Sequence, residues 1–297
     1  MQTNASHTGA SDRDFLYTKE DFRFIARLAY EEAGITLPES KEMLVYSRLG
    51  KRLRALGISE FKAYCALLSS EGAGDERRKM ISALTTNVTR FFREEHHFRH
   101  LSTAILPDLI ARAQKGGRLR IWSAGCSTGE EAYSIAFTLL KAFPEAARFN
   151  VRILATDVDP EVIAVARRGR YRGEAASALP DWVRSNYVSS VDGAEGGIEV
   201  NEQIRNFIDF RLLNLIQPLP MKGPFDVIFC RNVTIYFDAA TQDRLWEAFS
   251  RVMAPGSHLY IGHSERLSPR MSSHFATVGM TSYRLLPATA ASATSKG

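Results

Sequence analysis

Ile121-Trp-Ser-Ala-Gly-Cys-Ser-Thr-Gly-Glu-Glu131 is the most informative stretch of this 297-residue chain. It starts as a β-prone run, passes through small residues, and ends in two glutamates where a helical pattern of apolar residues begins. Small residues between a strand and a helix let the backbone approach a ligand at the carboxyl edge of a sheet, where doubly wound folds bind nucleotides. The segment therefore predicts a doubly wound α/β domain.

Further β-prone runs alternate with helical patterns downstream of this segment. They cover residues 151–156, 207–212, 226–230 and 258–262. This alternation predicts a mainly parallel sheet, which is the architecture of a Rossmann-like domain. Two late runs, at 275–278 and 282–285, flank a Gly-containing turn and predict a terminal antiparallel hairpin.

The upstream part of the chain has a different pattern. Apolar residues recur at helical spacing between glycine turns, without an alternating run, which predicts an all-α N-terminal domain. Residues 173–205 interrupt the α/β alternation and contain a Gly-rich turn, which indicates an inserted β-subdomain. The expected organisation is a disordered tail (1–13), the all-helical domain (14–84), a linker and helix (85–117), the Rossmann-like domain (118–286) with its insertion, and a second tail (287–297).

Composition and charge limit the class of protein. The chain is 45% hydrophobic and 24% charged, as in globular proteins, and has no apolar run long enough for membrane insertion. Its three cysteines form no CxxC pair, which indicates a reducing, cytoplasmic setting. The net charge of the chain is +5, and most of the excess of basic over acidic residues lies in residues 85–120. A local basic site facing an acidic partner fits this distribution better than a uniformly basic nucleic-acid binder.

The strand ends indicate the kind of cofactor. Glu130 and Glu131 at the helix start would repel a phosphate and suit a ligand that carries positive charge, although acidic side chains also complement a helix dipole. Asp157 ends the next strand, where an acidic residue usually binds ribose hydroxyls, whereas Asp159 before Pro160 has the place of a helix cap. A nucleoside with a positive centre and no phosphate cradle points to S-adenosylmethionine (SAM).

Five ordered motifs carry a resemblance to a known family. The chain resembles the CheR-type chemotaxis receptor methyltransferases from about residue 15 to 285, and Arg48–Gly57 is similar to their helical domain. The motifs are Thr86-Asn-Val-Thr-Arg-Phe-Phe-Arg-Glu94, Ile121–Glu131, Ala155-Thr-Asp-Val-Asp159, Phe225-Asp-Val-Ile-Phe-Cys-Arg-Asn-Val233 with Ile235-Tyr-Phe237, and Gly262-His-Ser-Glu265.

The resemblance implies a fold and an activity. The fold would be an all-α domain followed by a Rossmann-like SAM-dependent methyltransferase domain with an inserted β-subdomain. The activity would be protein-glutamate O-methylation, in which SAM gives its methyl group to glutamates of chemotaxis receptors and leaves as S-adenosylhomocysteine. The partner would be the cytoplasmic helical domain of methyl-accepting receptors, with a receptor C-terminal peptide as a further partner at the β-subdomain. No nucleic acid and no metal are expected.

The resemblance also assigns cofactor contacts, residue by residue. These residues lie in the linker, in the loops after the first two strands, and after the next two strands of the Rossmann-like domain. They are Asn87, Thr89 and Arg93; Glu130 and Asp157; Asn214 with Leu215; and Arg231 with Asn232.

A glutamate nucleophile sets unusual demands on the site. Its unperturbed pKa of about 4.3 leaves it ionised at neutral pH, so methyl transfer needs positioning and no general base. A guanidinium or a tyrosine hydroxyl can hold a carboxylate, and Arg93 and Tyr236 are the candidates for this catalytic role. The alternatives are a half-buried aromatic for Tyr236 and an ion pair with Glu94 or Glu130 for Arg93.

A basic helix over residues 44–56 is the candidate substrate-binding surface. Val45, Leu49, Leu53 and Leu56 fall in one sector, which predicts a buried face. The basic side chains on or beside the other face are Arg48, Lys51, Arg52 and Arg54. An acidic receptor helix is the expected partner; RNA is the competing one, weakened because no aromatic residues are interleaved.

The histidines make a metal site a weaker hypothesis. His96 and His100 have the i, i+4 spacing of a helical metal pair, but no Cys or carboxylate constellation joins them in the sequence. His263 lies in the motif that ends the fifth strand. Two other functions stay open: a Rossmann methyltransferase for RNA or a small molecule, and a non-catalytic SAM-binding regulatory module.

Overall fold

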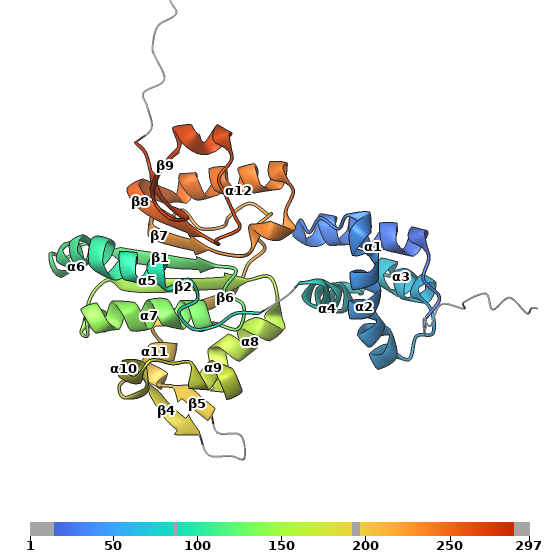
Figure 1. Cartoon of the computed structure of the whole chain (residues 1–297), viewed down its shortest axis with the longest axis horizontal. Coiled ribbons are helices and arrows are strands. Elements are labelled where there is room, and N and C mark those ends of the chain that lie inside the picture. Colours follow the sequence, from blue (N-terminus) through green and yellow to red (C-terminus); the bar gives the residue numbers. More distant parts are fainter. Residues whose placement is uncertain (1–14, 86–87, 192–196, 288–297) are drawn as a thin grey trace, which may run out of the picture. The chain divides into compact units, whose positions relative to one another are not determined.

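The computed structural model describes residues 15–85, 88–191 and 197–287, which form two compact units (Figure 1). One unit comprises the described residues up to Glu32 together with Thr36–Thr85. The other comprises Ala33–Ile35 and the described residues from 88 onward. The predicted tails, apart from Pro287, lie outside the described residues.

The first unit is all-helical. Its elements are α1 (Lys19–Ala33), whose last residue already belongs to the second unit, the 3-10 turn η1 (Glu39–Lys41), α2 (Glu42–Leu56), α3 (Phe61–Ser69) and α4 (Gly74–Leu84). Val45, Leu49 and Leu53 of α2 are fully buried, as their spacing predicts. Leu56 is 40% exposed, so its predicted place in the core is wrong. It is the last residue of α2, which ends at Gly57 in the left-handed conformation (φ 66°).

A part-buried ion pair joins α2 to α4 inside this unit. Arg52 donates to both carboxylate oxygens of Glu76, at 3.0 and 2.6 Å, and the Tyr64 hydroxyl donates to the same carboxylate at 2.9 Å. The Glu76 side chain is only 10% exposed. Arg52 therefore joins α2 to α4 within the helical unit, and its role in substrate binding stays a prediction.

The second unit is built on a seven-stranded sheet in the order β6-β2-β1-β7-β8-β10-β9. Strands β6, β2, β1, β7 and β8 are parallel, and β10 runs antiparallel to both β8 and β9, so the predicted hairpin is confirmed. The strands are β1 (Leu119–Ala124), β2 (Val151–Asp157), β6 (Ile208–Leu212), β7 (Phe225–Cys230), β8 (Met253–Ile261), β9 (Phe275–Gly279) and β10 (Ser282–Leu285).

Helices cover both faces of this sheet, with α7 on one side and α12 on the other (Figure 1). The covering helical elements are α5 (Glu95–His100), a π-helical turn (Leu101–Ile105), α6 (Leu106–Gln114), α7 (Glu130–Ala142), α8 (Pro160–Arg168) and α12 (Ala239–Val252). Side chains alternate along each strand: Ile121 packs with the α7 layer and Trp122 with the α12 layer. No helix in the described ranges is both long and apolar enough to span a bilayer.

A small subdomain is inserted between α8 and β6. It contains a three-stranded antiparallel sheet in the order β3-β5-β4, together with three short helices. Its elements are β3 (Arg170–Arg172), α9 (Gly173–Ser177), α10 (Asp181–Arg184), β4 (Val188–Val191), β5 (Gly197–Val200) and α11 (Glu202–Arg205). The insertion begins at β3, slightly before the predicted boundary, because β3 pairs with β5. Most of its Gly-rich turn lies outside the described residues.

Removing the Arg52 guanidinium should destabilise the helical unit. Arg52→Ala leaves the Glu76 carboxylate part-buried without its cation, and we expect the free energy of unfolding to fall by about 2–3 kcal/mol. Urea unfolding combined with hydrogen exchange in α2 and α4 measures the loss. Lys51→Ala removes an exposed cation from the same helix and serves as the matched control. Equal stabilities of the two variants would contradict the structural role of Arg52.

Candidate active site

The loops at the carboxyl ends of β1 and β7 pack closely together. Gly125 has φ 85°, and a Cβ atom there would lie 2.3 Å from Cγ2 of Val233. Gly129, at the start of α7, has φ 101°, and a Cβ atom there would lie 2.8 Å from Cβ of Ala166. Both positions need glycine because of backbone conformation and space. Gly125 therefore allows the β1 loop to pack against the β7 loop, and Gly129 allows it to pack against Ala166 of the helix that follows β2.

The two adjacent glutamates of α7 have different environments. Glu131 accepts hydrogen bonds from Ser123 Oγ at 2.7 Å and from Arg231 Nη1 at 3.1 Å. Glu130 is 5% exposed and accepts one from the Thr128 hydroxyl at 2.7 Å. Burial raises the pKa of both carboxyl groups. Glu131 is thus engaged by an internal cation, while Glu130 keeps a carboxylate suited to a positively charged ligand.

Asp157 ends β2 next to the same loop. Its carboxylate accepts hydrogen bonds from the backbone N–H groups of Ser127, at 2.8 Å, and Asp159, at 3.1 Å. Burial raises the pKa of Asp157, and the two backbone donors oppose that shift. Asp159 accepts from the Glu161 N–H and caps α8, as predicted. The backbone thus orients Asp157 at the strand end where ribose hydroxyls bind in such folds.

Arg231 lies in an internal network, and its side chain is only 2% exposed. Its guanidinium contacts Glu131, approaches Glu94 Oε2 at 3.4 Å, donates to the backbone carbonyl of Arg93, and lies 5.7 Å from the ring centre of Phe98. The Arg231 guanidinium is therefore engaged within the protein, where it positions Glu131 and the Arg93 backbone, and the cofactor contact of this residue stays a prediction.

Glu265 organises the loop that follows β7. Its carboxylate accepts hydrogen bonds from the N–H groups of Asn232, Val233 and Thr234 at 2.8–3.0 Å, and from the Thr234 hydroxyl at 2.8 Å. It also accepts from Gly262 N–H at 2.5 Å. These bonds hold Asn232 in a left-handed conformation with φ 59°. The sequence analysis assigned Glu265 no role. The feature that could have identified it is an acidic residue three positions after Gly262, at the end of a strand.

The segment that carries Arg93 is bent on both sides of this residue. Phe92 and Glu94 have positive φ values, 53° and 57°. Arg93 donates to the Val88 carbonyl at 3.1 Å, and in the described ranges it forms no ion pair with Glu94 or Glu130. Glu94 Oε1 accepts from the backbone N–H of His263 and lies 3.1 Å from its Nδ1. Arg231 and Glu94 thus fix the backbone of this segment, and the Arg93 side chain keeps part of its surface exposed.

The other predicted cofactor and catalytic residues belong to the second unit. Thr89 is half-buried, Asn214 Oδ1 accepts from the Ile216 N–H at 3.2 Å, and Leu215 packs against the α12 core. Tyr236 is half-buried in the 3-10 turn Thr234–Tyr236. Asn87 lies outside the described residues.

The remaining basic residues of α2 belong to the helical unit. Arg48 donates to the Leu84 carbonyl at 2.5 Å, Lys51 is exposed, and the Arg54 guanidinium lies 5.4 Å from the centre of the Phe15 ring. Lys51 and Arg54 are thus the exposed cations of this helix, while Arg48 is half-buried.

Comparison with known sequences establishes the family. Residues 87–284 match the family described as CheR methyltransferase, SAM binding domain, and residues 20–85 match the CheR methyltransferase all-alpha domain. The chain belongs to the CheR methyltransferase family. It is 48% identical to a probable chemotaxis protein methyltransferase of Rhizobium etli, over 86% of this chain and 96% of the relative. It is 41% identical to the chemotaxis protein methyltransferase of Escherichia coli, over 89% and 90% of the two chains.

The described residues fit a SAM-binding domain of the CheR family. A buried carboxylate with a single hydroxyl partner (Glu130) suits the positive charge of SAM. A carboxylate fixed by backbone donors at the end of β2 (Asp157) suits the ribose. The close loop packing at Gly125 and Gly129 lies at the same strand ends.

Loss of the Asp157 carboxylate should weaken SAM binding. Asp157→Ala removes charge-assisted acceptors, so we expect the dissociation constant for SAM to rise about tenfold or more. Isothermal titration calorimetry on the folded variant measures it, with Asp209→Ala as the control because Asp209 is 54% exposed. Unchanged affinity in Asp157→Ala, or measurable NAD binding by the wild-type protein, would contradict the assignment.

Proposed function

We propose that this protein methylates glutamate side chains of chemotaxis receptors, using SAM and releasing S-adenosylhomocysteine. The observation that carries the proposal is the match of residues 87–284 to a CheR SAM-binding domain, in a chain with full-length relatives named chemotaxis protein methyltransferases. The glutamate specificity and the cytoplasmic helical receptor domain as substrate come from the family resemblance.

The chemistry asks little of the protein beyond positioning. SAM supplies an activated methyl group; as the carboxylate oxygen forms its bond to the methyl carbon, the carbon–sulfur bond breaks and the two charges cancel. Glu130 and Asp157 hold the cofactor, while Arg93 and Tyr236 orient the carboxylate without accepting a proton. The networks of Arg231 and Glu265 keep the backbones near these two residues in place.

The substrate surface includes the basic residues of α2. Lys51 and Arg54 offer exposed positive charge to an acidic, glutamate-bearing helix, and Arg48 is nearby on the same helix. The β3-β5-β4 subdomain is the proposed place for a receptor C-terminal peptide, which would add a strand to its short sheet.

Mass-spectrometric mapping of methyl esters tests the function directly. The protein is incubated with SAM and membranes that contain receptors, and in parallel with total RNA. Methyl esters at receptor glutamates support the proposal. Label only in RNA, or none in any substrate despite SAM binding, would favour an RNA methyltransferase or a regulatory module instead.

Tyr236→Phe tests the base-free mechanism. The substitution keeps the ring and removes the hydroxyl, so SAM binding should persist while the single-turnover rate falls by about 5- to 100-fold, the equivalent of one orienting hydrogen bond. The ratio of wild-type to variant rates should be constant from pH 6.5 to 8.5. The reason is that a hydrogen bond that only orients the carboxylate involves no transfer of a proton. A ratio that changes with pH would indicate a general base, and an unchanged rate would remove Tyr236 from the site.

Charge reversal on α2 separates substrate recognition from cofactor binding. Lys51→Glu with Arg54→Glu should raise KM for receptors and leave the SAM dissociation constant unchanged. Lys62→Glu with Lys79→Glu makes the same charge change at exposed positions on α3 and α4 and is the matched control. Steady-state kinetics in which both double variants behave alike would return α2 to an ordinary solvated surface.

A further inference from the structure

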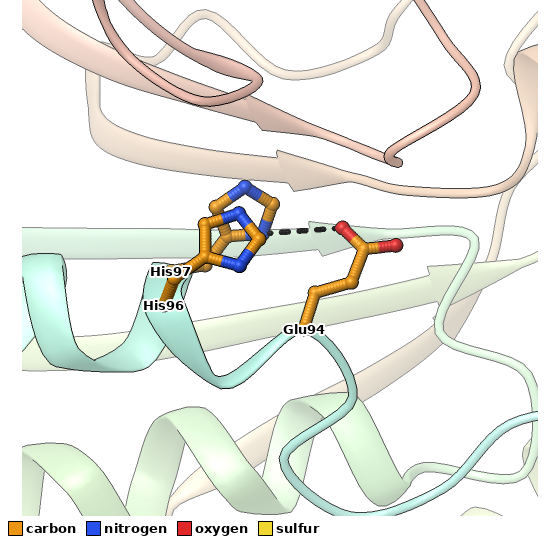
Figure 2. Close-up of side chains that lie close together, drawn as sticks. All are labelled: Glu94, His96 and His97. Carbon is orange, nitrogen blue, oxygen red and sulfur yellow. Dashed lines mark ion pairs between the residues drawn. The ribbon is translucent and has the colours of Figure 1, made fainter.

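Three side chains at the start of α5, Glu94, His96 and His97, lie close together (Figure 2). Glu94, His96 and His97 each direct one ligand atom to the same place, and these atoms all lie within 4.8 Å of one another. The His97 ring is fully buried. The sequence pattern suggested His96 with His100, but His100 Nδ1 lies 2.8 Å from the Tyr260 hydroxyl, and a carboxylate joins His96 through Glu94 instead.

In the described ranges the converging atoms lack hydrogen-bond partners, although Glu94 Oε2 also forms an ion pair with Nη2 of Arg231 at 3.4 Å. Glu94 Oε2, His96 Nε2 and His97 Nδ1 are buried and form no hydrogen bond in the described part of the chain. Glu94 Oε2 and His97 Nδ1 are 3.6 Å apart. A buried polar atom without a hydrogen bond is unfavourable, because its interaction with water has been lost. A single ion among the three would satisfy all of them at once.

We propose that Glu94, His96 and His97 bind one divalent transition-metal ion of the zinc class. Two imidazole nitrogens and a carboxylate oxygen form a common zinc ligand set, which leaves a fourth position for water. The ligand atoms of a tetrahedral zinc site are about 3.4 Å apart. Side-chain rotations that move the three ligand atoms by about 1 Å would therefore complete the site. His96 is half-exposed, and its ring centre lies 4.1 Å from that of His97.

Outer contacts already orient two of the ligands. His97 Nε2 lies 2.9 Å from the Thr281 hydroxyl, and the other oxygen of Glu94 is held by His263. Such partners direct the free ligand atom toward a metal and raise its affinity. A groove of about 860 Å³ is lined in part by Glu94, so one of the three ligand residues borders on solvent-filled space.

The neighbouring charges permit a cation and link the site to the active-site segment. Glu94 and Glu131 carry two negative charges against the one positive charge of Arg231. An ion bound to Glu94 Oε2 competes with Arg231, which also holds the Arg93 carbonyl. Given the proposed methyltransferase function, zinc should therefore slow receptor methylation by disturbing Arg93.

Zinc titration of the full chain tests the site. The protein is freed of metal and titrated with Zn²⁺ alone against a chromophoric chelator at neutral pH. We expect one saturable site in the wild-type protein and an affinity at least about tenfold lower in His96→Ala. His274→Ala removes an exposed histidine outside the cluster and should bind zinc as the wild type does. Mg²⁺ should not compete, because it prefers oxygen ligands.

Defined outcomes would overturn the proposal. Zinc affinities that are equal in the wild type, His96→Ala and a second variant, Glu94→Gln, would show that the cluster does not bind the metal. Circular dichroism confirms that each variant is folded. Methylation rates with and without zinc are then compared within each protein. Loss of zinc inhibition in His96→Ala supports the proposed effect of the metal on Arg93. Zinc binding without inhibition refutes this effect but not the metal site itself. Absent receptor methylation refutes the proposed function only.

Discussion

The buried carboxylate of Glu265 is the constraint on which the active-site edge depends. It binds the Gly262 N–H at the end of β8 and three successive N–H groups after β7, so it ties the ends of two neighbouring parallel strands together. A carboxylate buried to 4% exposure must have its lone pairs satisfied, and hydrogen bonds to a charged group contribute about 1.5–3 kcal/mol each. The loop that carries Asn232 and leads to Tyr236 owes its conformation to this one side chain.

Arg231 extends the same constraint to the other side of the site. It precedes the loop held by Glu265 and reaches Glu131 on α7 as well as the backbone of Arg93. A buried guanidinium is stable only where its charge is balanced, and Glu131 and Glu94 supply that balance. Three chain segments far apart in the sequence therefore meet on one cation, and the bent segment around Arg93 depends on it.

The fold could be predicted from the sequence more completely than the contacts between side chains. Alternating and helical periodicities located the sheet strands, the helical unit and the terminal hairpin, because both patterns are local. The roles of Arg52 and Arg231 were not predictable in this way. Their partners lie 24 residues away for Glu76 and 100 for Glu131, and no local pattern distinguishes an exposed basic residue from one with a buried acidic partner. Leu56 was misassigned because its helix ends there.

Glu130 and Glu131 illustrate how neighbouring identical residues separate into different functions. Successive residues on a helix point about 100° apart, so only one of them can face β7 and its buried arginine. Glu131 takes that direction and is neutralised within the protein, while Glu130 keeps a single hydroxyl partner. In the proposed SAM site, the positive centre of the cofactor would therefore meet Glu130 and backbone-bound Asp157, and not Glu131. Because Glu131 balances the charge of Arg231, the proposed cofactor site can contain a buried guanidinium nearby without repelling a cationic cofactor.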